Sequence, residues 1–524
     1  MLTQETTLTP LPPVAPKSDA TAIARGVGVN VLGTCAKTLK SGSFVVLTRL
    51  FGAEVFGLYM LSWSVIDLTA KIGNFGLDRA VLRFLPLHRY DGSTKAAYET
   101  ISRAFVISFL VSVVIAISLF FTAPLLSQRV FNKPDMAGML ALMALCLPCL
   151  AVLNIGLSVP KAHKIMKYDA YVRGISDPIV MFSVACIAFF LGWKLVGIAA
   201  GQVATMAVSA VLVVFIFKKF YSWRQCLAAL KSFTLWTPLT RFSIPVMGYE
   251  FVYILMIRLD TLMIGYFLPA LQVGIYAVAV EIALTTKKVR QWFDPIFSPI
   301  IAELHHLKEM DRLEHNFALV ARWILTINLC FLACVLLIGK DLLTLFGPEF
   351  GIGFVVVILL AFSQVVYASI GSGDTMLIMS GHPYINLVNT LIALALNFLL
   401  NLWLIPKYDM IGAAIGTLVA FTFLTVIRVV ELYHLYRIHP FRRVLWKPLV
   451  AGVMALFAVE AVAAALPDSS VLRLLALPLL FLVGYGALLL QFGLEPDDVT
   501  VVNRLKAKIK RSKPTDVTPL STTG

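Results

Sequence analysis

Apolar stretches of about twenty residues recur along most of the chain, separated by short polar segments. A helix needs roughly 20 apolar residues to cross the hydrocarbon layer of a bilayer. Helices also satisfy their backbone hydrogen bonds within one segment, which lipid demands. The sequence therefore predicts an all-α polytopic membrane protein with about fourteen transmembrane helices. They are expected at residues 26–49, 57–86, 101–126, 138–160, 173–192, 196–217, 242–268, 273–303, 317–339, 353–380, 385–405, 411–437, 448–466 and 471–491.

Composition and charge agree with lipid as the solvent and predict the orientation of the chain. Hydrophobic residues make up 59% of the 524 residues and charged residues only 14%, whereas soluble proteins carry about 25% charged residues. Alternate loops are rich in Lys and Arg, at 79–103, 161–173, 218–241, 308–322 and 437–447. Because basic loops face the cytoplasm, both termini are predicted to be cytoplasmic.

The net charge of +15 is then explained by topology and by contact with anionic membrane lipids. No nucleic-acid partner is predicted. The outer loops are short, which leaves little room for an extracellular catalytic or binding domain. We therefore predict no enzymatic activity, no metal and no cofactor.

The chain resembles itself at two places. The stretch 50–59 (LFGAEVFGLY) aligns with 267–276 (FLPALQVGIY), and 189–201 (FFLGWKLVGIAAG) aligns with 402–416 (LWLIPKYDMIGAAIG) after a two-residue gap. An even number of crossings per repeat gives parallel halves that face one another around a central cavity. The predicted domains are a cytosolic tail (1–24), two six-helix lobes (25–222 and 223–440), two added helices (441–495) and a basic cytosolic tail (496–524).

Deep polar residues concentrate in the first two segments of each lobe. A charge at bilayer depth costs at least about 2.5 kcal/mol and marks a functional-site candidate. The cations expected to line the cavity are Lys37, Lys40, Lys71, Arg258, Lys288 and, nearer the cytoplasmic mouth, Arg290. The polar residues expected beside them are Asn30, Thr34, Ser41, Asp67, Asn74, Glu281 and Thr285.

Other interpretations of these charges stay open. Cations near helix ends can extend to the headgroups, and Asp67 and Lys71, four residues apart, can neutralise each other. Glu250 lies on the same helix face as Arg258, whereas Asp260 points elsewhere and is expected to pair with another helix. Segment eleven carries a stripe of Asn386, Asn389, Asn397 and Asn401, which fits either helix–helix hydrogen bonding or a weak cation site.

Four strings carry a resemblance that covers roughly residues 25–490. They are TRLFGAEVFGLYMLSWSV (48–65), NFGLDRAVLRFLP (74–86), RLDTLMIGYFLPALQVGIYAVAVEI (258–282) and NLWLIPKYDMIGAAIGT (401–417). Together, in this order and at repeat spacing, they resemble the Wzx-like polysaccharide flippases of the MOP exporter superfamily.

The resemblance implies an alternating-access flippase. Its substrate would be a lipid-linked oligosaccharide on undecaprenyl pyrophosphate, moved from the cytoplasmic to the outer leaflet for lipopolysaccharide or exopolysaccharide assembly. A polysaccharide polymerase and glycosyltransferases are implied as partners. Some relatives bind sodium among segments seven, eleven and twelve, where Glu250, Asn397, Asn401 and Thr417 are the matching positions. Coupling to Na⁺, to H⁺ or to neither stays open.

Two relatives within the superfamily compete with this interpretation. A lipid II flippase shares the fold, but some of these carry an Arg just after the Tyr that opens segment eight, where this chain reads YAVAVEIALTTKK. A cation-coupled multidrug exporter often carries a buried acid in the first helix of a lobe. Here that helix holds Lys37 and Lys40 instead, although Asp67 could supply the acid.

Overall fold

The computed structural model describes residues 39–90, 92–163, 165–230, 238–463, 470–500 and 503, and every regular element among them is a helix. Twelve helical stretches in these residues are long and apolar enough to cross a membrane. One of them, Pro383–Tyr436, is broken at Asp409 into two helices, so it supplies two crossings. The predicted all-α polytopic fold is confirmed, and the segment expected at 26–49 lies largely outside the described residues.

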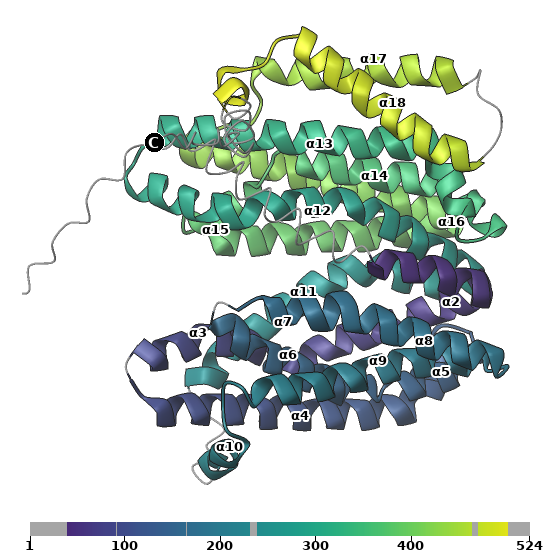
Figure 1. The fold of residues 1–524 in the computed structure, drawn as a ribbon, viewed down its shortest axis with the longest axis vertical. Coiled ribbons are helices and arrows are strands. Elements are labelled where there is room, and N and C mark those ends of the chain that lie inside the picture. The colour runs from purple at the N-terminus through teal and green to yellow at the C-terminus, as the bar shows by residue number, and fades with distance from the viewer. Residues whose placement is uncertain are drawn as a thin grey trace, which may run out of the picture.

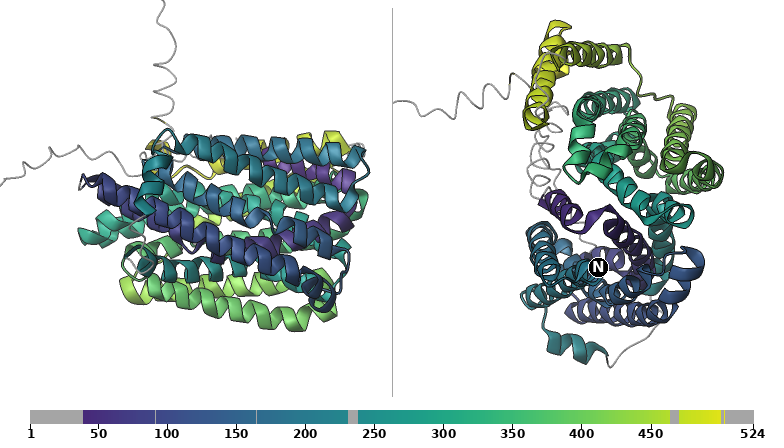
Figure 2. Two further views of the ribbon diagram at one scale, coloured as in Figure 1. Left: turned by 90° about the horizontal axis from the view of Figure 1, so that it is seen from below. Right: turned by 90° about the vertical axis from the view of Figure 1, so that its right-hand side faces the viewer.

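The helices form two bundles that lie side by side (Figures 1 and 2). The N-terminal bundle comprises α2 (Leu39–Asn74), α3 (Leu77–Tyr90), α4 (Thr94–Leu125), η2 (Leu126–Val130), α5 (Met136–Met143), α6 (Cys146–Ala162), α7 (Lys167–Asp169), η3 (Ala170–Ser176), α8 (Asp177–Phe190), α9 (Lys194–Phe217) and α10 (Trp223–Ala229). The C-terminal bundle comprises α11 (Pro238–Phe267), α12 (Ala270–His306), α13 (Met310–Thr344), η5 (Pro348–Gly353), α14 (Phe354–Ala368), α15 (Gly373–Met379) and α16 (Pro383–Tyr436). Helix α10 packs on α4, so the N-terminal bundle extends past the boundary predicted at residue 222.

Two further helices lie on the outside of the C-terminal bundle. After the short turn η6 (Arg443–Leu445), α17 (Trp446–Ala463) and α18 (Ser470–Gln491) pack on each other and on α13 (Figure 1). Their contact surface is apolar and includes Ala333, Ala455 and Phe481. These helices add to the bundle without entering the contact between the two halves.

Breaks in the long helices fall where the backbone has positive φ. Gly52 (φ 78°) separates two helical parts of α2, and glycine adopts this region without steric cost. Phe75 (φ 54°) and Gly76 (φ 66°) separate α2 from α3. The segment predicted at 57–86 is thus helical on both sides of a bend at Gly76, whose missing side chain lets α11 approach near Ser243.

The internal repeat is visible as a reciprocal contact between the bundles. A Cβ added at Gly57 of α2 would collide with the carbonyl oxygen of Ala270 on α12. A Cβ added at Gly274 of α12 would collide with the carbonyl oxygen of Ala53 on α2. These four residues are two pairs of equivalents in the alignment of 50–59 with 267–276. Small residues that let backbones approach are a main source of helix association in lipid.

Candidate functional site

Ion pairs join the two bundles where α2 and α3 face α11. Lys71 Nζ lies 3.0 Å from Glu250 Oε2, and Arg79 Nη2 lies 3.1 Å from Glu250 Oε1. Arg258 donates from Nη2 (2.8 Å) and Nε (3.0 Å) to Asp67 Oδ2. The arrangement is reciprocal, because a carboxylate of each bundle holds a cation of the other.

This group of five residues, the interface charge cluster, is partly accessible. The side chains of Lys71 and Arg258 are 27% and 21% exposed, and those of Asp67 and Glu250 are 24% and 13% exposed. The cluster contains three cations and two carboxylates, so it keeps an excess positive charge. Arg and Lys in a partly desolvated site are the groups that recognise phosphate.

The structure joins two of the predicted cavity cations, Lys71 and Arg258, in this cluster. Asp67 and Lys71 do not neutralise each other within α2; each pairs with a residue of α11 instead. Glu250 and Arg258 do not pair with each other either. Sequence patterns place residues on one helix but cannot tell which neighbouring helix supplies their partners.

The remaining predicted cations and cavity-lining residues have other places. Arg290 binds Asp374 (2.9 Å) and Asp294 (3.4 Å) within its own bundle, so two carboxylates already neutralise it. Glu281, Thr285 and Lys288 are half-buried on α12, and Asn74 is buried at the end of α2 with no hydrogen-bond partner for its Oδ1 among the described residues. Asn30, Thr34 and Lys37 lie outside the described residues, and for Lys40 and Ser41 only the helical backbone of α2 is described.

A second polar cluster is built around Asp260 inside the C-terminal bundle. Tyr276 on α12 donates to Asp260 Oδ2 (2.7 Å), and Asn401 on α16 donates to Oδ1 (2.8 Å). The hydroxyl of Thr417 also donates to Asp260, and Asn397 donates to Thr417 Oγ1 (3.2 Å). The expectation that Asp260 pairs with another helix is confirmed.

This Asp260 cluster corrects the predicted coupling site. Asn397, Asn401 and Thr417 do come together, but the acid beside them is Asp260, because Glu250 is bound to Lys71 and Arg79. Asp260, Tyr276, Asn397 and Thr417 line a pocket with about 570 Å³ of empty volume. The buried Oδ1 of Asn401 has no hydrogen-bond partner among the described residues. It lies against Gly416, where a Cβ would collide with it.

The chemistry of this cluster fits a small hard cation. Carboxylate, amide and hydroxyl oxygens are the ligands such ions prefer, and an unpaired buried acceptor is costly unless something satisfies it. The described residues contain no group of three or more His, Cys, Asp or Glu able to hold a metal. In this cluster the oxygens around the single carboxylate of Asp260 are neutral.

The other half of the asparagine stripe serves a different group. Arg428, which is 2% exposed, donates to Asn386 Oδ1 (2.7 Å) and to the hydroxyl of Tyr367 (3.0 Å). Asn389 donates to Glu431 Oε2 (2.6 Å). Here the asparagines connect two helical parts of α16, as the helix-packing interpretation predicts. Arg428 was not among the predicted site residues.

Further contacts hold the bundles together at the end predicted to face outward. Arg49 on α2 donates to the carbonyl oxygens of Thr344 (2.7 Å) and Leu345 (2.8 Å), at the C-terminus of α13. Lys133 donates to the carbonyl oxygen of Gly265, near the end of α11. Cations are favourable at helix C-termini, so these contacts close the bundles together at this end.

Comparison with known proteins agrees with the fold and decides the family. Residues 23–303 match the sequence profile described as polysaccharide biosynthesis protein, over more than half of the chain. The chain belongs to the polysaccharide biosynthesis protein family. The family evidence indicates a membrane transporter of the flippase type.

Individual relatives are more distant. The probable flippase AglR of Haloferax volcanii is 28% identical over 173 residues, which are 31% of this chain and 35% of that protein; the match thus spans about a third of the relative. The lipid II flippase MurJ in an inward closed conformation has a TM-score of 0.70 at 13% identity, with 88% and 97% of the two chains covered. A multidrug resistance MATE family transporter of the MOP superfamily, inward-facing, has a TM-score of 0.60 at 13% identity, with 81% and 96% covered. At such identities the structures establish a shared fold.

Proposed function

We propose that this protein is an alternating-access flippase that moves an undecaprenyl-pyrophosphate-linked oligosaccharide from the cytoplasmic to the outer leaflet for surface polysaccharide assembly. It would act in a bacterial cytoplasmic membrane with both termini in the cytoplasm. Glycosyltransferases would supply its substrate and a polymerase would take its product. The membership in the polysaccharide biosynthesis family and the MOP-type fold support this proposal.

The observation that carries the proposal is the interface charge cluster. A pyrophosphate brings two or more negative charges to membrane depth and needs Lys or Arg to balance them. Lys71, Arg79 and Arg258 are held at the contact between the bundles by carboxylates, so they are oriented before substrate arrives. The diphosphate would replace Glu250 and Asp67 as the partner of these cations.

Exchange of partners would link substrate binding to the movement of the bundles. The ion pairs join α2 and α3 to α11, and a diphosphate that takes their cations removes this connection. The bundles can then rock about the cluster, while the polyprenyl tail stays in lipid. The contacts of Arg49 and Lys133 at the opposite end would have to break when the site opens outward.

Coupling to a cation belongs to the same proposal. Asp260 with Asn397, Asn401 and Thr417 would hold Na⁺, or Asp260 alone a proton. Bound Na⁺ would let Asp260 stay ionised while its hydrogen-bond donors turn away, whereas a bound proton would neutralise it. Because this cluster lies entirely in the C-terminal bundle, the ion and the diphosphate would occupy different sites of one transport cycle.

The multidrug-exporter alternative has less support from the geometry. The acid that it needs could be Asp67, but Asp67 accepts two hydrogen bonds from Arg258. A carboxylate already neutralised by Arg is a poor partner for a cationic drug. Resistance of cells to cationic dyes on overexpression tests this alternative directly, and resistance that depends on Asp67 would establish it.

Complementation of a flippase-null strain tests the proposal. Lys71→Ala and Arg258→Ala should each lower surface polysaccharide at least about tenfold at normal expression, because charged hydrogen bonds contribute about 1.5–3 kcal/mol each. Lys407→Ala is the matched control, since Lys407 is exposed and, among the described residues, its ammonium group lies over the ring of Trp403. Full surface polysaccharide in both cluster variants would refute the proposal.

A charge exchange separates substrate binding from interface stability. Lys71→Glu places a carboxylate against Glu250 and should abolish complementation. Adding Glu250→Lys restores the pair between positions 71 and 250 in reverse but loses the Arg79–Glu250 pair, so we expect it to recover protein stability in part. If the double variant recovers stability but complements no better than Lys71→Ala, the position of the cation matters to the substrate, as proposed.

A further inference from the structure

The cytoplasmic end of the N-terminal bundle carries a basic pocket that the transport site does not use. Residues 218–224, which run from the end of α9 into the first turn of α10, line an open pocket. Lys218, Lys219 and Arg224 are exposed there. Figure 1 shows α10 at the edge of the bundle, at the same end as the last turns of α3 and α15.

The three cations of this basic pocket have no carboxylate partner among the described residues. Lys218 Nζ lies 5.2 Å from the ring centre of Phe215, and Lys219 Nζ lies 5.8 Å from that of Tyr168. Lys167 also approaches Tyr168, at 5.3 Å. Aromatic faces contribute only about 0.5–1 kcal/mol at exposed sites, which leaves these like charges near one another without a neutralising anion.

A buried donor in the same pocket also lacks a partner. The Nε1 atom of Trp223 is buried and makes no hydrogen bond within the described part of the chain. The indole is held by Phe217, with ring centres 4.3 Å apart, and by Phe105 at 5.5 Å. An indole N–H can only donate, so an acceptor is what would complete this site.

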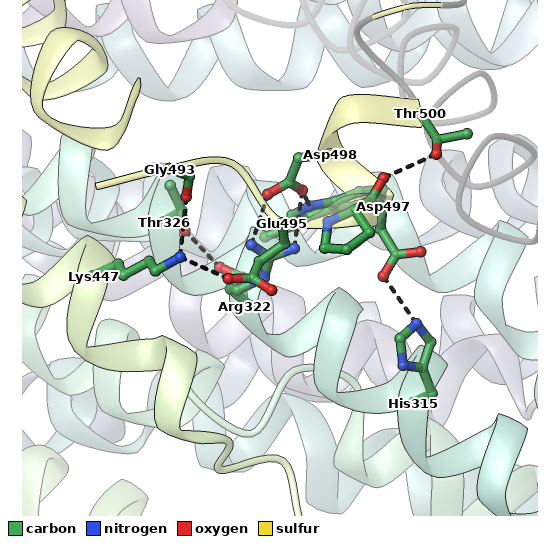
Figure 3. A network of polar contacts seen from close by, with 11 residues as sticks. His315, Arg322, Thr326, Lys447, Gly493, Glu495, Asp497, Asp498 and Thr500 are labelled. Atoms are coloured by element: carbon green, nitrogen blue, oxygen red, sulfur yellow. Dashed lines mark hydrogen bonds and ion pairs between the residues drawn. The ribbon is translucent and has the colours of Figure 1, made fainter. Parts of the chain in front are cut away.

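The equivalent end of the C-terminal bundle shows how such charges are balanced. The repeat aligns residues 218–224 with 433–439. At this end of the C-terminal bundle, basic side chains of α13 meet acids from residues 495–498 (Figure 3). Arg322 forms a two-pronged pair with Asp498 (2.7 and 2.9 Å), and His315 contacts Asp497 (2.9 Å). Trp323 Nε1 also donates to Asp498 (2.8 Å).

The comparison identifies the chemistry that the N-terminal bundle lacks. In the C-terminal bundle one carboxylate satisfies an arginine and an indole N–H together, whereas Arg224 and Trp223 meet no carboxylate in the part of the chain that the structure describes. An oxyanion with several acceptor oxygens would serve both, and phosphate is the group that Lys and Arg bind at a membrane surface. Leu227 of α10 is 65% exposed, which fits a helix that rests against lipid.

We propose that residues 218–224 form a binding site for the phosphate of an anionic phospholipid headgroup in the cytoplasmic leaflet. Lys218, Lys219 and Arg224 supply the charge, and Trp223 Nε1 donates to a phosphate oxygen. The acyl chains lie beside α10. This lipid would anchor the N-terminal bundle at the bilayer surface, as residues 495–498 anchor α13 to the end of α18. The site does not depend on the proposed transport function.

Native mass spectrometry of the purified full-length protein tests this site with phosphatidylglycerol, and with phosphatidylcholine as the neutral lipid. The variant Lys218→Ala/Lys219→Ala/Arg224→Ala should bind phosphatidylglycerol about tenfold to a hundredfold more weakly, because each basic residue near an anionic surface contributes about fivefold. Lys194→Ala/Lys340→Ala/Lys407→Ala is the matched control, since it removes three exposed cations from the predicted outer end. Trp223→Phe keeps the ring but removes the donor, and we expect about a fivefold loss.

Each outcome decides the proposal. Loss of phosphatidylglycerol binding in the triple variant, with wild-type binding in the outer-end control, supports it. Equal binding in both variants, or wild-type protein that binds the two lipids equally, overturns it. Farnesyl diphosphate is the probe for the other phosphate source: if it displaces phosphatidylglycerol from wild-type protein but not from Lys71→Ala protein, the lipid occupies the transport site instead, and the proposal is wrong.

Discussion

The two bundles share one fold but differ in the chemistry at equivalent places. In the C-terminal bundle Tyr276 donates to Asp260, and Thr417 and Asn401 complete the cluster. The repeat aligns Tyr276 with Tyr59 and places Thr417 opposite Gln202. In the N-terminal bundle Tyr59 donates to Gln202 Oε1 (2.8 Å), and both side chains are buried.

The two tyrosines differ in the charge and in the amide groups that surround them. By the same alignments Ser43 stands opposite Asp260, and Val184 and Ala188 stand opposite Asn397 and Asn401. A neutral Tyr–Gln bond satisfies itself, whereas a buried carboxylate needs several donors or a cation. The comparison teaches that duplication supplied the framework twice, while among the described residues the buried carboxylate and its amide partners are found in the C-terminal copy.

The largest effect is expected where the copies are the same. Gly57→Leu and Gly274→Leu should each prevent folding, because even a Cβ at either position collides with the backbone of the other bundle, and overpacking of several atoms costs well over about 3 kcal/mol. The measurement is the monodisperse fraction after detergent extraction. Gly484→Leu is the control, since nothing lies within 4 Å of a Cβ there. If one glycine variant folds normally and the other does not, the two copies are not equivalent at this contact.

A smaller but more specific effect is expected where the copies differ. Asp260→Asn should abolish any stabilisation of the purified protein by Na⁺ relative to K⁺ and should lower complementation about tenfold or more, because the sole carboxylate of the cluster is lost. Gln202→Leu should leave both unchanged, since the equivalent N-terminal place holds no charge. Thermal unfolding in NaCl and KCl measures the first quantity.

Two results would contradict this asymmetry. Wild-type protein with the same unfolding temperature in both salts would exclude Na⁺ binding and leave coupling to a proton or to no ion. Loss of the Na⁺ effect in Gln202→Leu protein would show that the ion binds in the N-terminal bundle. Glu250→Gln separates the two acids of α11: it should reduce complementation through the interface charge cluster and leave the Na⁺ effect intact.

The sequence predicts more of the fold than of the contacts. Segment number, helical class and the repeat follow from apolar length and from strings such as 50–59 and 267–276. The stripe periodicity also predicted that Lys71 and Arg258 lie on polar helix faces, and both belong to the interface charge cluster. It could not show that Asp260 and not Glu250 joins Asn397, because that choice depends on the rotation of α11 between α2 and α16. Nor could it show that α2 ends at Asn74.

The smallest expected effect compares the two tyrosines. Tyr59→Phe leaves the buried Gln202 without its donor and should destabilise the protein by about 1–3 kcal/mol, with no change in complementation and no change in Na⁺ response. Tyr276→Phe removes one of several donors to Asp260, so its loss of stability should be similar. Na⁺ should restore this stability, because the ion can take the place of the missing hydroxyl hydrogen. Unfolding temperatures in NaCl and KCl for both variants measure the difference. A Na⁺-dependent recovery in Tyr59→Phe protein, or none in Tyr276→Phe protein, would mean that the copies do not differ in ion binding.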